Sequence, residues 1–509
     1  MSVERPAMPR LRRTTTVAAL AAALTALPAI AAGPALPTKS TYGAIKGFKL
    51  LGSTTLGDRG VNSPIAVAGR CVYVGDRYDK NGIAVVDVRN PRKPRQVNVI
   101  PPVSGATQRE LRADVGLGLL VVMNYSLTTG GSGNSVKLYD IATDCTKPTL
   151  LSTYAMGPRS PHEFFLWKDA KRPGRALVYL ANTLFSPDLE VLDITDPTSP
   201  RVAAVYDLGI DASEKTADVL QSGSGYLHSL SVTDDGRRAY MGTWDYGFYV
   251  ADTSALADPA VSSVTLPVIR PVGAGKVNYG SNVHGAVRVP GRPLAVMVEE
   301  AYANAGAGCP FGHLRMADVS DEAAPKLLGE FKLQENDCDR ARAVNGTFTS
   351  HNQTVFPNVV LMGWYAGGLR AVDISDPTKP VESGAFVPKP TFEPGRRDTR
   401  LFFPRAEANQ WIGAMWSYPV VQDGLVYVVD VDLGLFILEY TGKHAKEVRQ
   451  AGYVEGNSSP ARLTRTDPIV KRSTPVVPGA PTVVRSPYAD LPLPPRALRG
   501  PYGFLCVGV

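Results

Sequence analysis

The chain has 509 residues, of which 44% are hydrophobic and 20% are charged, so it is long and apolar enough to bury a large core. Its formal net charge of +7 is concentrated at the ends, because residues 1–32 carry +3 and residues 456–509 carry +5, which leaves the rest at about −1. A nucleic-acid-binding protein would carry its basic surface on the folded body, so this distribution argues against a nucleic-acid partner.

The first 32 residues are typical of a secretory signal. Arg10, Arg12 and Arg13 precede the Ala-rich apolar run "TTTVAALAAALTALPAIAA", whose end is typical of cleavage near Ala31 or Ala32. A membrane anchor is the less favoured alternative, because the run is short and contains a proline. We therefore expect a mature protein that is secreted or attached to the cell surface, with no integral membrane segment. The sequence does not distinguish the general secretory route from the twin-arginine route.

A short motif, a strand that runs into a proline-containing turn, recurs along the chain. The clear copies are "GIAVVDVRNPRKP", "SVKLYDIATDCTKP", "DLEVLDITDPTSP" and "GLRAVDISDPTKP", which end at Pro94, Pro148, Pro200 and Pro380. Weaker copies end at Pro259 and Pro325, and a seventh, "GLFILEYTGKHAKE", keeps the strand but loses the turn. An Asp or Asn side chain can accept a backbone N–H and proline presets φ, so the motif predicts a strand that ends in a tight turn.

Each repeat contains four strand patterns and no helical periodicity, which is typical of a β-propeller blade. We predict an all-β, seven-bladed propeller of four-stranded blades over residues 43–455, with a row of β-sandwiches as the alternative. The segment 45–57 resembles a spare outer strand that would pair with the last blade and close the ring. Residues 456–509 are Pro-rich and basic, and we expect them to be largely irregular.

The copies "AVVDVRNPRKP", "VLDITDPTSP" and "AVDISDPTKP" resemble LVIVD repeats, which are known from secreted and surface proteins of bacteria and archaea and are expected to form β-propellers. The resemblance covers most of residues 60–440, and the repeated D-[IV]-x-[DN]-P-x-x-P is fairly specific. The fourth, fifth and seventh repeats depart from this pattern. The resemblance implies a scaffold and says little about function, because a fold does not determine an activity.

The five cysteines test the predicted blade layout, and export would permit disulfides. In a propeller the loops between successive strands alternate between the two faces. Cys71 and Cys145 fall on one face of adjacent blades, and Cys309 and Cys338 fall together on the other face. We predict these two disulfides, with Cys506 left over.

Four of the six histidines occupy one place in the repeat, at the start of the innermost strand of four consecutive blades. They are His162, His228, His284 and His351, and we expect them to line one arc of the channel mouth. Imidazole is a common ligand of transition metals, so the pattern predicts a site for copper or zinc. The alternatives are a structural polar lining and metal-free acid–base groups.

Other residues are expected near the same face. The matching places in the remaining repeats fall near Asn62, Glu110 and Ser417. Glu110 is the expected acidic partner of the histidines, whereas Glu163 is expected to point to the opposite side of its strand. Glu299, Trp244 and Trp364 are candidates for the wall of a small-ligand pocket. The alternative for the aromatic residues is that they cap the core.

The sequence leaves several functions open. The first is a propeller whose His-lined face binds a metal ion or a small ligand. The second is a non-catalytic surface scaffold that binds an extracellular protein or a wall polymer. A third is a copper-dependent oxidase similar to the methanethiol oxidases, which this chain resembles in architecture only. Whether the protein is an enzyme is left open.

Overall fold

In the computed structural model the chain is described over these residues: 43–77, 80–126, 133–157, 159, 161–182, 187–206, 225–244, 247–257, 264–265, 268–269, 282–301, 312–336, 348–389, 415–456, 480–487 and 489. The predicted signal sequence, the predicted Cys309–Cys338 pair and Cys506 lie outside these ranges. Within them, no helix is long and apolar enough to cross a membrane.

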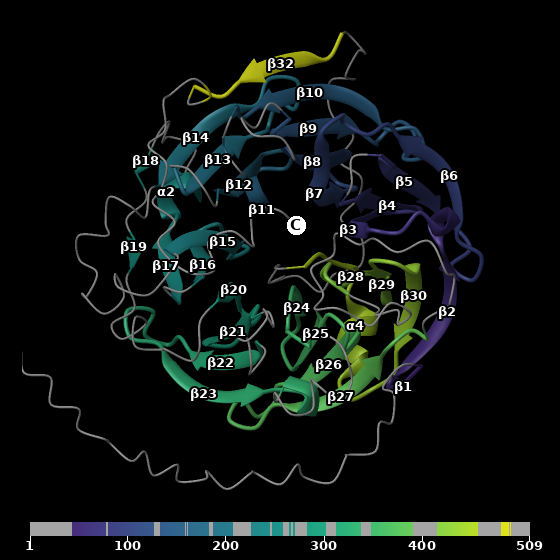
Figure 1. Cartoon of the computed structure of the whole chain (residues 1–509). Helices are drawn as coiled ribbons and strands as arrows, with labels where there is room; N and C mark the ends of the chain where they lie inside the picture. Colours follow the sequence, from purple (N-terminus) through teal and green to yellow (C-terminus); the bar gives the residue numbers. More distant parts are fainter. Residues whose placement is uncertain are drawn as a thin grey trace, which may run out of the picture. The chain divides into compact units, whose positions relative to one another are not determined.

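The described strands form seven blades around a central axis, which confirms the predicted all-β propeller (Figure 1). Blade one consists of β3 (Asn62–Ala68), β4 (Cys71–Asp76), β5 (Ile83–Asp87) and β6 (Arg95–Ile100). Blade two consists of β7 (Ala106–Asp114), β8 (Leu119–Ser126), β9 (Ser135–Asp140) and β10 (Thr149–Ala155). Blade three consists of β11 (Pro161–Lys168), β12 (Ala176–Asn182), β13 (Leu189–Asp193) and β14 (Arg201–Tyr206). Blade four consists of β15 (Gly225–Val232), β16 (Arg238–Trp244), β17 (Phe248–Asp252) and β19 (Val268–Ile269). Blade five consists of β20 (Val283–Arg288), β21 (Leu294–Glu299), β22 (Leu314–Asp318) and β23 (Lys326–Phe331). Blade six consists of β24 (Gln353–Val355), β25 (Val359–Gly363), β26 (Leu369–Asp373) and β27 (Val381–Phe386). Blade seven consists of β28 (Val420–Gln422), β29 (Leu425–Asp430), β30 (Gly434–Tyr440) and the N-terminal β2 (Phe48–Thr54).

Short elements add to this frame. They are β1 (Ile45–Lys46), β18 (Val264–Thr265), β31 (Tyr453–Val454), β32 (Thr482–Arg485), η1 (Leu56–Asp58), η4 (Gln334–Asn336), α2 (Ser254–Ala257) and α4 (Ala445–Gln450). β1, β18, β31 and β32 each extend the sheet of one blade. Blades four and five share one sheet, because Trp244 of β16 pairs with Val283 of β20.

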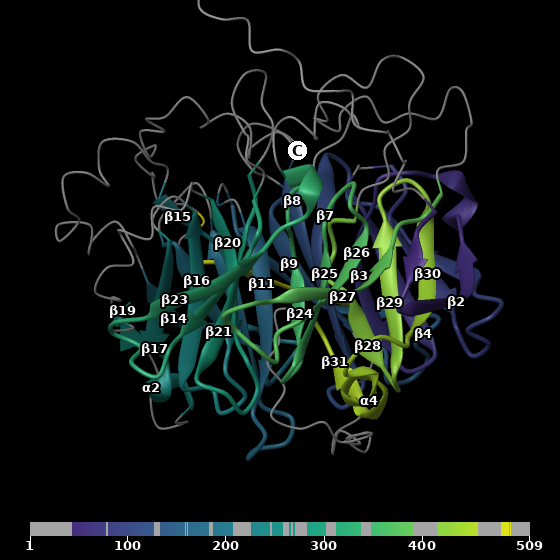
Figure 2. The same ribbon diagram turned by 90° about the horizontal axis from the view of Figure 1, so that it is seen from below.

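The blades are apolar on both faces, and this forces them to pack against one another. Every residue of β3, β4 and β5 is buried, whereas the outermost strand β6 is mostly exposed. Seven buried apolar clusters lie between the blades, one for each pair of neighbours. The cluster that joins the last blade to the first contains Val67 and Ile437, so the ring is closed. Figure 2 shows the same blades turned by 90°.

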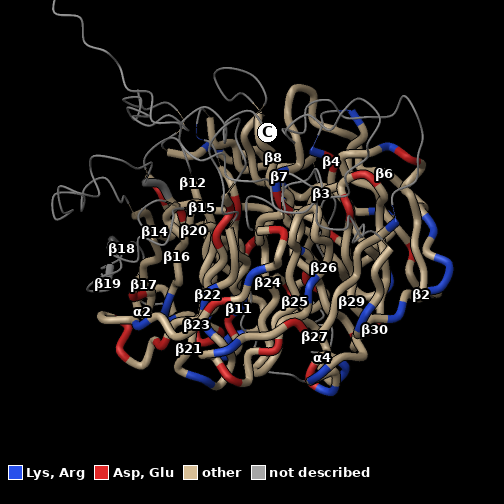
Figure 3. Tube along the Cα trace, turned by 60° about the horizontal axis from the view of Figure 1, so that its bottom comes forward, with Lys and Arg blue, Asp and Glu red and all other residues tan. Residues whose placement is uncertain are grey.

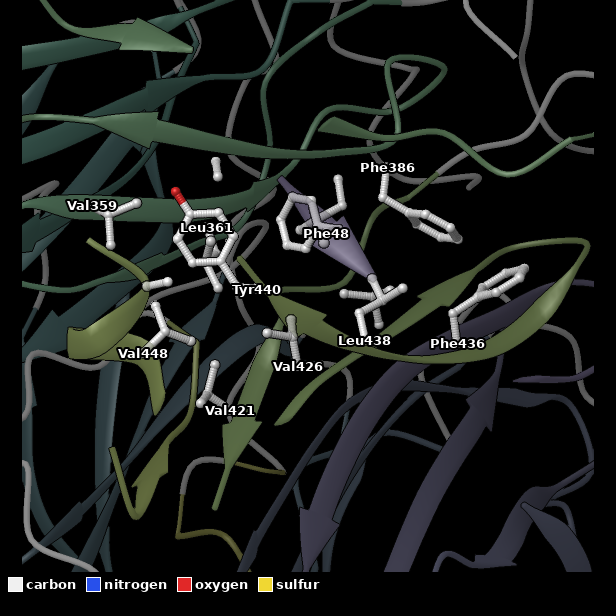
Figure 4. Close-up of a cluster of buried hydrophobic side chains, with 14 of the residues drawn as sticks. Phe48, Val359, Leu361, Phe386, Val421, Val426, Phe436, Leu438, Tyr440 and Val448 are labelled. Atoms are coloured by element: carbon white, nitrogen blue, oxygen red, sulfur yellow. The ribbon is translucent and has the colours of Figure 1, made fainter. Parts of the chain in front are cut away.

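The N-terminal strand completes the last blade. β2 pairs antiparallel with β30 as the outermost strand of blade seven, which confirms the predicted closure. Phe48 of β2 enters the cluster between blades six and seven, where its ring centroid lies 5.0 Å from that of Tyr440 (Figure 4). β1 pairs with β27 of blade six, so the N-terminal segment joins two blades rather than one.

The repeated motif forms two consecutive side-chain-capped turns. In blade three the Asp193 Oδ1 accepts the Thr195 N–H at 2.9 Å, and the Asp196 Oδ1 accepts the Thr198 N–H at 3.0 Å. The first of these bonds recurs at Asp87, Asp252, Asp318 and Asp373. The Asx residues of the motif therefore make the predicted turn between the third and fourth strands by accepting backbone N–H groups.

One predicted disulfide lies within the described residues. Cys71 of blade one and Cys145, which follows β9 of blade two, are bonded, with their Cα atoms 6.0 Å apart. The bond joins adjacent blades on one face, as the assignment of loops to faces predicted.

The C-terminal tail, which we expect to be largely irregular, contains one short strand, β32. β32 pairs in parallel with β10 at the outer edge of blade two, where backbone groups would otherwise be unpaired. The Arg159 guanidinium donates to the Ser486 Oγ at 3.1 Å, so side chains also tie this segment to the propeller.

The charged residues of both signs are interspersed along the described blades (Figure 3). This agrees with the nearly neutral body calculated from the sequence.

Removing one buried side chain from the closing strand β2 tests how much that strand contributes to stability. We expect Phe48→Ala to lower the free energy of unfolding by about 3 kcal/mol, because it empties a buried aromatic site between two blades. Leu50→Ala on the same strand, at a side chain that is 40% exposed, is the control and should cost less than about 1 kcal/mol. Equilibrium unfolding in urea measures both, and equal losses would mean that β2 is not held by its apolar face.

The turn carboxylates predict a pH dependence. Burial alone raises the pKa of Asp373, but hydrogen bonds from Lys443 and Ser375 outweigh this effect and lower it to about 2. Because the folded pKa is depressed, the stabilisation is present above about pH 4 and is lost as the pH falls toward 2. Asp373→Asn should therefore destabilise the protein by about 2 kcal/mol at pH 6 and by much less near pH 2. Unfolding at both pH values checks this, and a constant difference would contradict it.

Candidate functional site

Four imidazoles come together at the inner strands of blades three to six. The ring centroids of His162 and His228 are 4.0 Å apart, those of His228 and His284 are 4.3 Å apart, and those of His284 and His351 are 4.1 Å apart. Three of them lie on β11, β15 and β20, and His351 lies just before β24; these strands surround the central axis in Figure 1. All four side chains are buried.

A β-bulge lies at this level of the inner strands and turns the histidines inward. The pairing register shifts between Pro161 and Glu163 of β11 and between Val283 and Gly285 of β20, so His162 and His284 are the extra, unpaired residues. A bulge interrupts the alternation of side chains across a strand. Glu163 therefore faces the histidines together with its neighbour, and the expectation that it points away is wrong.

Glu300, the residue after β21, lies among three of the imidazoles. Its Oε1 is 3.0 Å from the His351 Nε2, and its Oε2 is 3.7 Å from the His228 Nε2 and 3.9 Å from the His284 Nε2. The Tyr365 hydroxyl donates to Oε1. The sequence placed this residue beside Glu299, and only the tertiary structure identifies it as the carboxylate at the histidine cluster.

Glu163 is the second carboxylate of the cluster. Its Oε1 lies 3.1 Å from the His284 Nε2, and the Ser229 hydroxyl is a further hydrogen-bond partner of its carboxylate. Its Oε2 is buried and has no hydrogen-bond partner among the described residues. The position therefore offers one oxygen that the surrounding protein does not use.

Burial and neighbouring charges shift the pKa values of the histidines in different directions. Burial, and then the neighbouring Arg109, hold the pKa of His162 well below its usual value. Burial also lowers the pKa of His228 well below its usual value, and the adjacent imidazoles add to the effect. Burial alone would lower the pKa of His284, but Glu163 and Glu300 raise it.

The two glutamates are held in the ionised state. Burial opposes ionisation, but His284 and His351 lower the pKa of Glu163 to about 2. For Glu300, His351 is the largest of the groups that lower the pKa in spite of burial. Anionic carboxylates beside neutral imidazoles are the forms that bind a metal ion.

Aromatic side chains and one backbone carbonyl orient the imidazoles. Trp244 stacks on His228 with the ring centroids 4.6 Å apart and the planes 17° apart. The Nδ1 of His351 is hydrogen-bonded to the Trp416 carbonyl, which leaves its Nε2 directed to Glu300, an arrangement typical of a metal-ligating histidine. Trp244 and Tyr365 both have positive φ, at 55° and 36°, and such backbone strain tends to occur at functional sites.

Arg109, rather than Glu110, occupies the histidine place in blade two. The register of β7 shifts between Gln108 and Glu110, so Arg109 is the extra residue. Its Nη2 lies 2.9 Å and 2.8 Å from the two ring nitrogens of His162. The sequence alignment of the repeats placed Glu110 at this position as the acidic partner of the histidines. The bulge, which the sequence does not reveal, shifts the position by one residue to Arg109.

Glu110 instead belongs to a buried network around Arg112. The Arg112 Nη2 donates to the Glu110 Oε1 at 2.7 Å, and the guanidinium carbon lies 4.4 Å from the ring centroid of Tyr418. Glu455, from the segment that follows β31, lies 3.6 Å from the same guanidinium. Groups from blades two and seven and from the C-terminal segment therefore meet at this point, three residues along β7 from Arg109.

Two further candidates lie away from the cluster. Glu299 forms an ion pair with Arg315 at 2.8 Å. Trp364 is fully buried in the cluster between blades five and six, where its Nε1 donates to the Phe348 carbonyl at 2.8 Å. Trp364 therefore belongs to the core, whereas Trp244 contacts the histidines.

The cluster could hold a metal ion. Three overlapping groups each offer one ligand atom per residue within 4.8 Å of the others: His162, Glu163 and His228; Glu163, His284 and His351; and His228, His284 and Glu300. Two ligands bound to one ion at about 2.1 Å can lie at most about 4.2 Å apart. The four imidazole–carboxylate distances, from 3.0 to 3.9 Å, are within this limit.

Comparison with known proteins identifies the repeat. The sequence model of the LVIVD repeat matches residues 59–98 and 363–387. No curated protein matches the chain. Among solved structures, Sqt1 from Chaetomium thermophilum is similar, with 12% identity over 78% of this chain and 100% of that chain and a TM-score of 0.45. The same protein bound to the N-terminus of the ribosomal protein L10 is 14% identical over 76% of this chain and 89% of that chain, with a TM-score of 0.41.

Close packing around His284 predicts the effect of one substitution. A Cβ added at Gly242 of β16 would lie 2.4 Å from the His284 carbonyl oxygen, so Gly242→Ala must move one of the two strands. We expect it to cost about 2 kcal/mol of stability. At Gly285, a Cβ would meet no atom closer than 3.6 Å, so Gly285→Ala is the matched control and should stay within about 0.5 kcal/mol of wild type. Unfolding measurements distinguish the two, and equal stability would contradict the close approach.

Proposed function

We propose that this chain, an LVIVD-repeat protein with a β-propeller fold, binds a transition-metal ion at the channel mouth through His228, His284, His351 and Glu300. One observation carries the proposal. The Nε2 atoms of the three histidines face a single buried carboxylate at 3.7, 3.9 and 3.0 Å. Burying a carboxylate is costly unless a cation compensates its charge, and a metal ion bound by these imidazoles would supply that charge.

The donor set indicates the class of ion. Imidazole and carboxylate together suit zinc, copper, iron or nickel, and no thiolate takes part. Zinc sites with histidine and glutamate ligands are common, and copper also prefers imidazole, so both ions predicted from the sequence remain candidates. His228 and His284 lie on inner strands, His351 lies just before β24 and Glu300 directly follows β21, so packed strands position the ligands. Such a site can keep a coordination position open for a small ligand.

We also propose that the protein works outside the cytoplasm, either secreted or attached to the cell surface. Two observations support this location. The first 32 residues have the composition of a secretory signal. The Cys71–Cys145 bond is of a kind that persists in oxidising compartments. The partner in this setting would be a small molecule, or alternatively an extracellular protein or wall polymer.

Metal analysis of the purified protein tests the main proposal. After incubation with zinc and removal of the excess, we expect at least one ion per chain. Glu300→Gln together with His284→Ala should lower the affinity at least about 100-fold, because two ligands are lost. His444→Asn is the control, since His444 lies at α4 and contacts Asp373 instead of the cluster, and it should bind as wild type does.

The same experiment separates the alternatives. A folded protein that binds no zinc or copper would sink the metal proposal and favour the non-catalytic scaffold. A protein that retains copper in preference to zinc would favour the copper-dependent oxidase. The assay for that activity is the oxidation of a small thiol by the copper-loaded protein.

A further inference from the structure

We propose that the cluster holds two metal ions, bridged by the carboxylates of Glu163 and Glu300. This inference rests on the proposed metal-binding function and deepens it. One ion would be bound by His162 and His228, and the other by His284 and His351. The ions would be divalent first-row metals that accept imidazole and carboxylate together, such as manganese, iron, cobalt or zinc.

The number of donors is the first argument. The cluster contains four imidazoles and two carboxylates, and each of these six residues offers a ligand atom. A single four-coordinate ion uses only four of these six ligands. An ion at His228, His284, His351 and Glu300 alone would leave His162 and Glu163 outside its coordination sphere.

The position of Glu163 is the second argument. A ring nitrogen of His284 that binds an ion has no proton to offer, so the 3.1 Å contact between its Nε2 and Glu163 would lose its hydrogen bond. Glu163 would then be a buried anion with a second oxygen that already has no hydrogen-bond partner among the described residues. Coordination by Glu163 removes this cost. Glu163 forms one three-residue group with His162 and His228 and another with His284 and His351, which is the position of a bridging ligand.

The carboxylate of Glu300 reaches both halves of the cluster. Oε2 is 3.7 Å from the His228 Nε2, in one half, and 3.9 Å from the His284 Nε2, in the other, and Oε1 is 3.0 Å from the His351 Nε2. The centroids of His228 and His284, the inner pair of rings, are 4.3 Å apart. Ions in two-metal sites are commonly about 3.5–4 Å apart, so the spacing of the ligands is compatible with a bridged pair.

Arg109 makes the two ions unequal. Its guanidinium lies within 2.9 Å of His162, at one end of the cluster, and its positive charge opposes a cation there. The His284–His351 ion should therefore bind first, and the His162–His228 ion at least roughly tenfold more weakly. Arg109→Gln should strengthen the second step and leave the first unchanged.

Titration of the full-length protein with zinc alone, followed by calorimetry and by metal analysis, tests the pair. We expect two ions per chain in wild type and in the His444→Asn control, bound in two steps, and one ion in His162→Ala. One ion in wild type would overturn the pair while leaving the proposed function in place. No ion at all would overturn both. Two ions in His162→Ala would also overturn this assignment of ligands.

A spectroscopic measurement avoids dependence on stoichiometry alone. In the protein loaded with two equivalents of Cu²⁺, carboxylate-bridged ions should couple, so the electron paramagnetic resonance signal per copper should be well below that of an isolated ion. His162→Ala should restore the full signal of a single copper. An uncoupled signal from two coppers in wild type would contradict the bridge. Circular dichroism of each variant confirms that the loss of an ion is not a loss of fold.

Discussion

The structure depends on one constraint, which is that a blade apolar on both faces must be covered by another blade on each side. The first three strands of blade one are buried throughout, and an unpaired blade would expose this surface to water. Only a closed ring satisfies the requirement for all seven blades. The apolar clusters between neighbours and the closing strand β2 are the result.

Ring closure also decides where the polar residues meet. Because every blade places its first strand nearest the axis, the starts of these strands converge around the axis. Residues that are hundreds of positions apart in the sequence become neighbours there; the Ser63 and Ser417 hydroxyls, for example, are 3.0 Å apart. The ring at this level is divided, with imidazoles on blades three to six and Arg109 and two serines on the other blades.

The bulges then determine which side chains enter this space. At a regular position, consecutive residues would point to opposite faces of the blade, and only one of His162 and Glu163 could reach the cluster. Because of the register shift, both side chains point toward the cluster, so a carboxylate lies beside the histidines. Strained backbone at Trp244 and Tyr365 holds the aromatic groups that pack against the same imidazoles. Three residues along β7 from Arg109, the buried Arg112 guanidinium forms ion pairs with Glu110 and Glu455.

The sequence by itself determined the repeat, the seven blades, the closing strand, the Cys71–Cys145 bond and the alignment of the four histidines. These features follow from local signals: alternation of apolar residues, Asx-Pro turns and equal places in a repeat. The identities of Glu163, Glu300 and Arg109 as the neighbours of the histidines were decided only by the tertiary structure, as was the assignment of Glu110, Glu299 and Trp364 to other parts of the fold. A one-residue bulge changes the face on which a side chain lies, and its presence depends on how neighbouring strands and blades pack, which no local pattern in the chain records.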